Sequence, residues 1–314
     1  MAANGPDNII HLAQVTKTVG GRDLVSDLTF DVGRGQLFGL IGPSGGGKTT
    51  TVRLMVGIYA PTAGEVRVLG TDPTRFSLTQ RERIGYMPQH FFLQPTLTAG
   101  ENLSFVASLY GIGWLKRRKL IPRVLREMEL WEARDRLAKD LSGGMLRRLQ
   151  VAAVMLPEPD LMFIDEPMAG LDPLLRDRMW QILYRLRDRG STILLTTQIT
   201  QEAERCDAVI LIKDGRIVAN GTPDELRSRA LGGEAARVLV EGRLPEAMSV
   251  LWSARGVSEV TRDGERAIRV VTNQDHGALD RAIDSVRHRG IKVDAVEKAT
   301  PSFDEVFERL VRGA

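Results

Sequence analysis

A glycine-rich segment near the start of the chain has the residue types and spacing of a phosphate-binding loop. It follows the pattern G-x-x-x-x-G-K-[ST] and consists of Gly42, Pro43, Ser44, Gly45, Gly46, Gly47, Lys48 and Thr49. Glycines let backbone N–H groups turn inward around phosphate oxygens. Lys48 is then expected to reach the β- and γ-phosphates of a nucleotide, and the Thr49 hydroxyl to bind Mg²⁺. The alternative is a glycine-rich turn with a solvated lysine.

Two adjacent carboxylates follow a short apolar run in the middle of the chain. Residues 161–164 have a strand-like composition, and Asp165 and Glu166 come directly after them. If this strand ends beside the phosphate loop, Asp165 would hold Mg²⁺ directly or through water. Glu166 could then polarise a water molecule for in-line attack on the γ-phosphate. The alternative interpretation is a solvated strand end.

A third candidate is the segment that begins with Ser142 and continues with Gly143, Gly144 and Met145. It precedes a helical pattern, for which Ser142 is a good N-cap, and the N–H groups at such a helix start form an anion site. Taken alone, Ser-Gly-Gly is a common loop. Its position between the phosphate loop and the carboxylate pair gives it weight.

The elements around these residues alternate between strand and helix. Strand patterns cover 9–15, 24–32, 36–41, 161–164 and 192–197, and helical patterns cover much of 97–137 together with 142–156 and 173–189. A strand, a glycine loop and a helix in this order create a phosphate site. The alternation predicts an α/β fold with a mainly parallel sheet that is covered on both faces.

The pattern restarts after a linker-like Gly232–Gly233 pair. Strand, helix, strand, strand, helix and strand follow one another between 236 and 296, and a final helix is predicted over 303–311. Asp263–Gly264 is typical of a hairpin turn. The order fits a small ferredoxin-like α+β domain. We therefore predict two domains, 1–230 and 231–314.

Composition narrows the class of protein. The chain of 314 residues has 43 basic and 40 acidic side chains, and this balance does not predict nucleic-acid binding. Its one cysteine, Cys206, cannot form an internal disulfide. No apolar run reaches the ~18 residues of a membrane span, and the first residues lack the charged and apolar regions of a signal peptide. We expect a soluble, cytosolic chain that reaches a membrane only through a partner.

Taken together, the motifs resemble those of the nucleotide-binding subunits of ATP-binding-cassette (ABC) transporters. Five elements occur in the order of that family: the Walker A loop at 42–49, a glutamine loop at Gln89, the signature at 141–145, Walker B at 161–166, and a D-loop at 169–172. The resemblance covers about residues 8–225. It implies a cassette with a mainly parallel core sheet, an antiparallel β subdomain and a helical subdomain at about 90–140, with residues 231–314 as an accessory domain.

The resemblance also implies roles for individual residues. Two cassettes pack head to tail, and ATP lies between Walker A of one chain and the signature of the other. The implied catalytic residues are Glu166, Gln198, Gln89 and Lys48; the implied Mg²⁺ ligands are Thr49, Gln89 and Asp165; the implied ATP contacts are residues 42–50, with Thr50 the last, together with Val19, Ser142, Gly143, Gly144, Met145 and Asp172.

Three positions depart from the family pattern. Met145 stands where the signature usually has glutamine, and methionine there resembles a branch of drug and polysaccharide exporters that carry a short C-terminal domain. Gln198 stands where the family has a switch histidine; it can donate a hydrogen bond to a γ-phosphate oxygen but carries no charge. Val19 stands where an aromatic ring usually stacks on adenine, and valine offers only dispersion contact.

The resulting expectation is an ATP-hydrolysing subunit that powers an exporter. Its implied partners are a second cassette, as a homodimer, and separate transmembrane permease subunits, without nucleic acid. The implied location is the cytoplasmic face of the cell membrane. A slow-turnover ATP-gated switch and an importer ATPase remain as alternatives. DNA-repair relatives need a long coiled coil before the signature, and translation factors carry two cassettes in one chain, so neither class fits this sequence.

Overall fold

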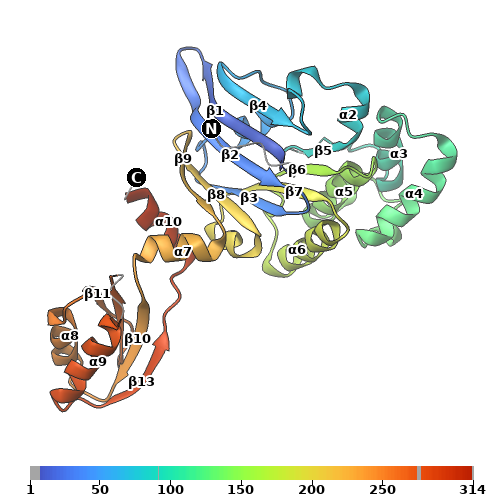
Figure 1. Cartoon of the computed structure of the whole chain (residues 1–314). Coiled ribbons are helices and arrows are strands. Elements are labelled where there is room, and N and C mark those ends of the chain that lie inside the picture. The colour runs from blue at the N-terminus through green and yellow to red at the C-terminus, as the bar shows by residue number, and fades with distance from the viewer. Residues whose placement is uncertain (1–7, 91, 274–276, 313–314) are drawn as a thin grey trace. The chain divides into compact units, whose positions relative to one another are not determined.

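The computed structural model describes residues 8–90, 92–273 and 277–312 (Figure 1). The chain forms two compact units, Met1–Asn220 and Gly221–Ala314. The division lies before helix α7 (Pro223–Leu231), whereas the sequence places the domain boundary after this helix. Each unit has its own sheet and its own apolar core, so each is described separately.

The first unit is built on a six-stranded sheet with the order β5-β6-β7-β3-β8-β9. The strands are β3 (Leu37–Ile41), β5 (Ile84–Met87), β6 (Leu161–Asp165), β7 (Thr192–Thr197), β8 (Ala208–Lys213) and β9 (Arg216–Gly221). Neighbours from β5 to β8 run parallel. Every residue of β3, β6 and β7 is buried, as expected for strands covered on both faces. The predicted mainly parallel sheet is confirmed.

A smaller antiparallel sheet, of order β2-β1-β4, packs against the core sheet. Its strands are β1 (Asn8–Val19), β2 (Arg22–Gly33) and β4 (Ala63–Val68). Gly20 and Gly21 form the turn between β1 and β2 with φ of 56° and 78°, a region that glycine adopts without strain. One apolar cluster joins both sheets to α1 (Lys48–Met55) through side chains that include Leu12, Phe30 and Phe163. This is the predicted antiparallel β subdomain.

Helices occupy most of the segment between β5 and β6, and Figure 1 shows α3 and α4 side by side next to α5. The helices of this unit are α2 (Leu78–Glu82), α3 (Ala99–Leu109), α4 (Trp114–Glu127), α5 (Gly143–Met155) and, after β6, α6 (Pro173–Asp188). A capping box between Thr98 and Glu101 begins α3. Helix α4 begins at Trp114, so the basic residues 116–119 lie in its first turns.

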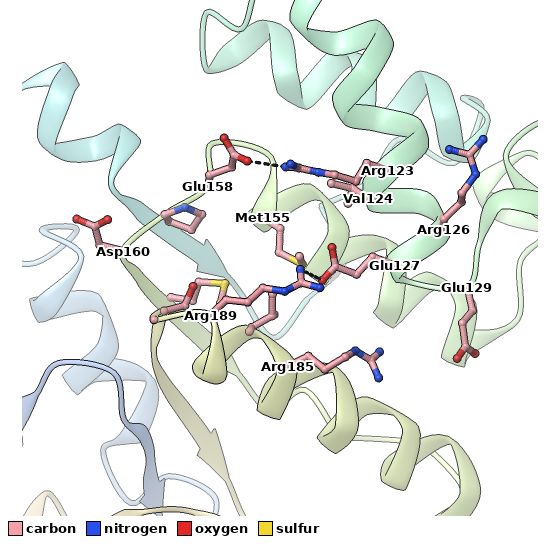
Figure 2. A pocket seen from close by; sticks show the side chains of 15 residues that line it. Arg123, Val124, Arg126, Glu127, Glu129, Met155, Glu158, Asp160, Arg185 and Arg189 are labelled. Carbon is pink, nitrogen blue, oxygen red and sulfur yellow. Dashed lines mark hydrogen bonds and ion pairs between the residues drawn. The ribbon is translucent and has the colours of Figure 1, made fainter.

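A groove separates α4 from the loop before β6 and the end of α6 (Figure 2). Two ion pairs cross this groove of about 980 Å³: Arg123 donates to Glu158 over 2.5 Å, and Arg189 donates to Glu127. Partly exposed ion pairs contribute about 0–1 kcal/mol each. These ion pairs therefore orient α4 relative to α6 and the loop before β6, but they are too weak to hold it rigidly.

The second unit has the predicted order of strands and helices. It contains β10 (Ala235–Val240), α8 (Leu244–Ser253), β11 (Val257–Arg262), β12 (Ala267–Thr272), α9 (Ala278–His288), β13 (Val293–Lys298) and α10 (Phe303–Arg312), preceded by α7. The antiparallel sheet order β11-β12-β10-β13 is that of a ferredoxin-like fold. Val238, Leu251, Val270 and Val286 form its core. The buried Ile291 packs into this core two residues before β13 begins.

In the ranges that the structure describes, none of the helices is both long enough and apolar enough to cross a membrane.

Candidate active site at the carboxyl ends of the core strands

The phosphate loop connects β3 to α1 and has a backbone that only glycine can follow at two positions. A Cβ atom on Gly42 would lie 2.0 Å from the carbonyl oxygen of Ile212 on β8. Gly47, just before α1, has a φ of 104°, which is strained for any residue with a side chain. Gly46 N donates to Pro43 O over 3.1 Å and closes the loop on itself. The loop therefore has a fixed curvature at the start of a helix.

Lys48 is held over this loop and is 5% exposed. Its Nζ donates to the carbonyl oxygens of Gly42 (2.9 Å) and Pro43 (3.0 Å) and lies 3.6 Å from Oε1 of Glu166. Burial lowers the pKa of Lys48, and the carboxylates of Glu166 and Asp165 act in the opposite direction. The loop thus holds a cation at the point where phosphate oxygens would enter.

The side chains of Thr49 and Asp165 bring together two oxygen atoms that could bind a metal ion. Thr49 Oγ1 donates to Asp165 Oδ2 over 3.0 Å, and the Thr196 hydroxyl donates to the other carboxylate oxygen. Asp165 is 1% exposed at the end of β6. Hydroxyl and carboxylate oxygens are suitable ligands for Mg²⁺. Among the described residues there is no group of three acidic, histidine or cysteine side chains that could hold a metal, so an ion here would draw its remaining ligands from nucleotide and water.

Glu166 stands at a sharp turn directly after β6. Its φ is 53°, in the left-handed region that a non-glycine residue occupies at a cost of roughly 1–3 kcal/mol. Its backbone N–H donates to the carbonyl oxygen (3.2 Å) and hydroxyl (3.0 Å) of Thr196, and its carbonyl oxygen accepts a 2.9 Å bond from Arg147. Its side chain accepts a 2.7 Å bond from Gln198 Nε2. The turn directs the carboxylate toward the phosphate loop.

These groups line one cavity of about 510 Å³. Its lining residues are Arg22, Asp23, Leu24, Ser44, Gly45, Gly47, Lys48, Thr49, Thr50, Gln89, Glu166, Gln198 and Asp214. The predicted site residues that lie together here are therefore Ser44, Gly45, Gly47, Lys48, Thr49, Thr50, Gln89, Glu166 and Gln198. Asp165 is hydrogen-bonded to Thr49. Gly42, Pro43 and Gly46 form the part of the loop beneath Lys48.

The other predicted residues do not line this cavity. Exposed Ser142 caps α5 by accepting a 3.3 Å bond from Met145 N, with Gly143 and Gly144 between them. Asp172 caps α6 by accepting a 2.9 Å bond from Leu175 N. Val19 lies at the end of β1 and is 51% exposed. The signature and the D-loop thus present helix starts to solvent, away from the Lys48 cavity of their own chain.

Several lining residues were missed by sequence reasoning. Arg22 and Asp23 follow the glycine turn that begins β2, and Asp214 occupies the turn between β8 and β9. Arg147, which contacts Glu166 and Gln89 through their backbone oxygens, was also missed. Only weak features of the sequence point to these residues. Arg22, Asp23 and Asp214 are expected in turns next to glycine, and Arg147 is a basic residue two positions after the signature.

The chain is similar to known proteins over most of its length. A family model described as ABC transporter matches residues 25–169. The chain is 36% identical to the daunorubicin/doxorubicin resistance ATP-binding protein DrrA of Streptomyces peucetius, over 97% of this chain and 93% of that protein. It is 39% identical to Nod factor export ATP-binding protein I of Paraburkholderia xenovorans (strain LB400), over 74% of this chain and 77% of that protein.

Two solved structures have the same fold in the cassette region. One is described as an ATP binding subunit of an ABC transporter; it is 31% identical, covers 70% of this chain and 92% of its own, and has a TM-score of 0.64. The other is a dimeric post-hydrolysis state of the ATP-binding cassette MJ0796 bound to ADP and Pi; it is 26% identical, covers 68% of this chain and 98% of its own, and has a TM-score of 0.62.

Proposed function

The chain belongs to the ATP-binding subunits of ABC transporters, which are ATPases, and from this premise we propose that it hydrolyses ATP at the Lys48–Glu166 site to power an exporter through separate membrane subunits. The observation that carries the proposal is the cavity in which the Lys48 cation lies 3.6 Å from the Glu166 carboxylate at the mouth of a closed phosphate loop. Support for export comes from the relatives, whose names describe drug resistance and Nod factor export.

In this proposal, the loop N–H groups and Lys48 bind the β- and γ-phosphates. Thr49 Oγ1 and Asp165 Oδ2, which lie 3.0 Å apart, would hold Mg²⁺, and Gln89 in the lining of the same cavity would offer a further oxygen. When bound, the ion neutralises phosphate charge. Lys48, Thr49 and the loop position the nucleotide, and positioning together with electrostatic stabilisation supplies almost all of catalysis in phosphoryl transfer.

Glu166 acts as the general base that orients and deprotonates the attacking water. Its backbone conformation and its bond to Gln198 hold the carboxylate at the cavity mouth. Gln198 contacts Glu166 through a neutral amide and can donate one of its amide hydrogens to a γ-phosphate oxygen when nucleotide is present. The contribution of Gln198 is therefore a hydrogen bond without a positive charge.

The signature completes the site in trans. The start of α5 at Ser142, Gly143, Gly144 and Met145 lies outside the Lys48 cavity of its own chain, with Ser142 and Gly143 exposed. In a head-to-tail homodimer, they would contact the nucleotide bound to the partner's phosphate loop, with Asp172 at the interface. The complex would lie at the cytoplasmic face of the membrane, attached through its membrane subunits, with residues 231–314 as an accessory domain that braces the assembly.

The 2.7 Å bond between Gln198 and Glu166 also favours a second candidate function, an ATP-gated switch that turns over slowly. The two functions are separated by steady-state phosphate release from the chain reconstituted with its membrane subunits in proteoliposomes. Multiple turnovers that accelerate with transported substrate support the exporter ATPase. ATP-dependent closure with less than one turnover per transport cycle would contradict it and support the switch.

A further inference from the structure

Arg147 joins the helix that begins at the signature to two parts of the candidate active site. It lies on α5, is 4% exposed, and uses both ends of its guanidinium group. Nη1 donates to the carbonyl oxygen of Gln89 over 3.1 Å, and Nη2 donates to the carbonyl oxygen of Glu166 over 2.9 Å. One side chain therefore holds the glutamine loop and the turn after β6 at the same time.

A neighbour one helical turn away extends this link. Gln150 Oε1 accepts a 3.1 Å bond from Arg147 Nη1, and Gln150 Nε2 donates to the carbonyl oxygen of His90 over 3.3 Å. Gln150 is completely buried. The loop at 89–90 is thus tied to α5 by two side chains on the same face of one helix.

The chemistry of this link requires arginine. Burial lowers the pKa of Arg147, while the carboxylates of Glu166 and Asp165 favour its charged form. The guanidinium group presents donors in a fixed planar fork and can bridge two carbonyl oxygens from different segments, whereas the lysine ammonium is a compact point charge. Its bond to the Glu166 carbonyl oxygen supports a backbone that is in the strained left-handed region.

We propose that Arg147 is a positioning residue that fixes the Glu166 turn and the Gln89 loop relative to α5. The proposal rests on the catalytic roles assigned above to Glu166 and Gln89. Because Ser142 caps the N-terminus of α5, the position of the signature in one chain then sets the geometry of the hydrolytic groups in the same chain. When the signature of one chain binds the partner's nucleotide, the buried Arg147 cation therefore couples the position of α5 to Glu166 of the same chain.

The adjacent Arg148 provides a matched control. It lies on the same helix and is 9% exposed, but its guanidinium donates to the carbonyl oxygen of Met128 (3.0 Å) and to Glu129 Oε2 (3.2 Å). These partners belong to the segment after α4. Replacing Arg148 therefore perturbs helix packing of similar burial, while the two hydrogen bonds of Arg147 to Gln89 and Glu166 stay in place.

The test compares R147K, R147Q and R148K in the full-length chain, with melting temperature, MgATP affinity from a fluorescent nucleotide, KM and kcat measured for each. A small misplacement of reacting groups costs up to roughly 10²-fold in rate. We expect R147K and R147Q to lower kcat by about 10- to 100-fold while nucleotide affinity and KM change by less than about threefold. R148K should leave kcat within about twofold of wild type. Unchanged kcat in both Arg147 variants would overturn the proposal.

A double-mutant comparison separates action through Glu166 from a general structural effect. Single-turnover phosphate release is measured for E166Q and for E166Q/R147K. If Arg147 acts through Glu166, the second change alters the residual rate by less than about twofold. The same loss in both backgrounds would contradict the link from Arg147 to Glu166. If E166Q alone left hydrolysis intact, the role that the proposed function assigns to Glu166 would fail; if E166Q abolished hydrolysis and R147K did not lower it, only the role of Arg147 would fail.

Discussion

The Nε2 amide of Gln198 donates a 2.7 Å hydrogen bond to Oε1 of Glu166, the same oxygen that lies 3.6 Å from Lys48 Nζ. The carboxylate is therefore held between a cation and a neutral amide at the mouth of the cavity. A histidine at position 198 would be partly protonated near neutral pH, whereas glutamine contacts Glu166 in the same way over that whole range. From this contact we predict how the ATPase rate and its pH dependence change when Gln198 is replaced.

Replacing Gln198 by histidine should raise the ATPase rate. Charge-assisted hydrogen bonds are about twice as strong as neutral ones, so ~1 kcal/mol or more of stabilisation is regained when the imidazolium meets phosphate charge in the transition state. We expect a threefold to tenfold increase, since ~1.4 kcal/mol is a factor of ten. The rate should also gain a pH dependence between about pH 6 and 7.5.

Steady-state phosphate release over this pH range checks the prediction, with Gln201→His as a control that adds an imidazole at an exposed position outside the lining of the cavity. A lower rate in Gln198→His, or a pH profile identical to wild type, would show that the surrounding residues are adapted to glutamine.

Replacing Lys48 by alanine should abolish turnover and greatly weaken nucleotide binding. Without Lys48, the loop offers only N–H dipoles to the phosphate charge. Nucleotide affinity is measured by isothermal titration with MgATP. Lys116→Ala on α4, where the side chain is 62% exposed, serves as a control for the loss of one positive charge. Hydrolysis at the wild-type rate in Lys48→Ala would rule out the phosphate-loop assignment.

The buried Glu202 predicts a pH-dependent loss of stability. It is 3% exposed, and Arg176 Nε lies 3.9 Å from its Oε1 atom. Burial raises the pKa of Glu202 above its usual value. A raised pKa in the folded state means that stability is highest below the unfolded-state pKa and falls as pH rises through the folded-state pKa.

Glu202→Gln should remove this loss, so its melting temperature should exceed that of wild type more at pH 8 than at pH 5. Each kcal/mol recovered corresponds to about 2–4 °C for a protein of this size. Thermal unfolding at both pH values provides the measurement, and Glu204→Gln on the exposed side of the same segment is the control. An equal shift at both pH values would contradict a buried Glu202 whose charge destabilises the native state.

Deleting residues 232–314 should leave a chain that binds ATP. The residues of the cavity lie at or before Asp214, and the second unit has its own apolar core. We expect MgATP affinity close to that of the full chain and weaker ATP-dependent dimerisation. Light scattering and nucleotide titration check both properties. A truncated chain that does not fold, or that folds without binding nucleotide, would make the C-terminal unit part of the catalytic core.

Much of the arrangement around Lys48 follows from sequence rules alone. The carboxyl ends of parallel strands meet at one edge of a sheet, so a loop after β3, a carboxylate pair after β6 and Gln198 after β7 must lie together. The glycine pattern specifies the loop, because a Cβ atom at position 42 would collide with a backbone oxygen and Gly47 has a positive φ. Local spacing and strand order are enough for these predictions.

The remaining contacts depend on tertiary geometry. Arg147 reaches backbone oxygens of Gln89 and Glu166, and no side-chain type at those positions signals a partner for it. Asp214 joins the cavity only because β8 and β9 form a hairpin at that edge, and the sequence pattern did not separate these two strands. The left-handed turn at Glu166 is likewise imposed by Thr196 and Arg147 from other elements.

Glu166 performs the hydrolytic step in the mechanism proposed above, and Glu166→Gln removes the base from this step. The amide keeps the size of the side chain and removes the base, so ATP binding should persist while hydrolysis slows by roughly 10²–10⁴-fold. Size-exclusion chromatography with MgATP, together with phosphate release from the same sample, provides the measurement. We expect a stable ATP-bound dimer with almost no released phosphate; hydrolysis at the wild-type rate would show that Glu166 is not the base.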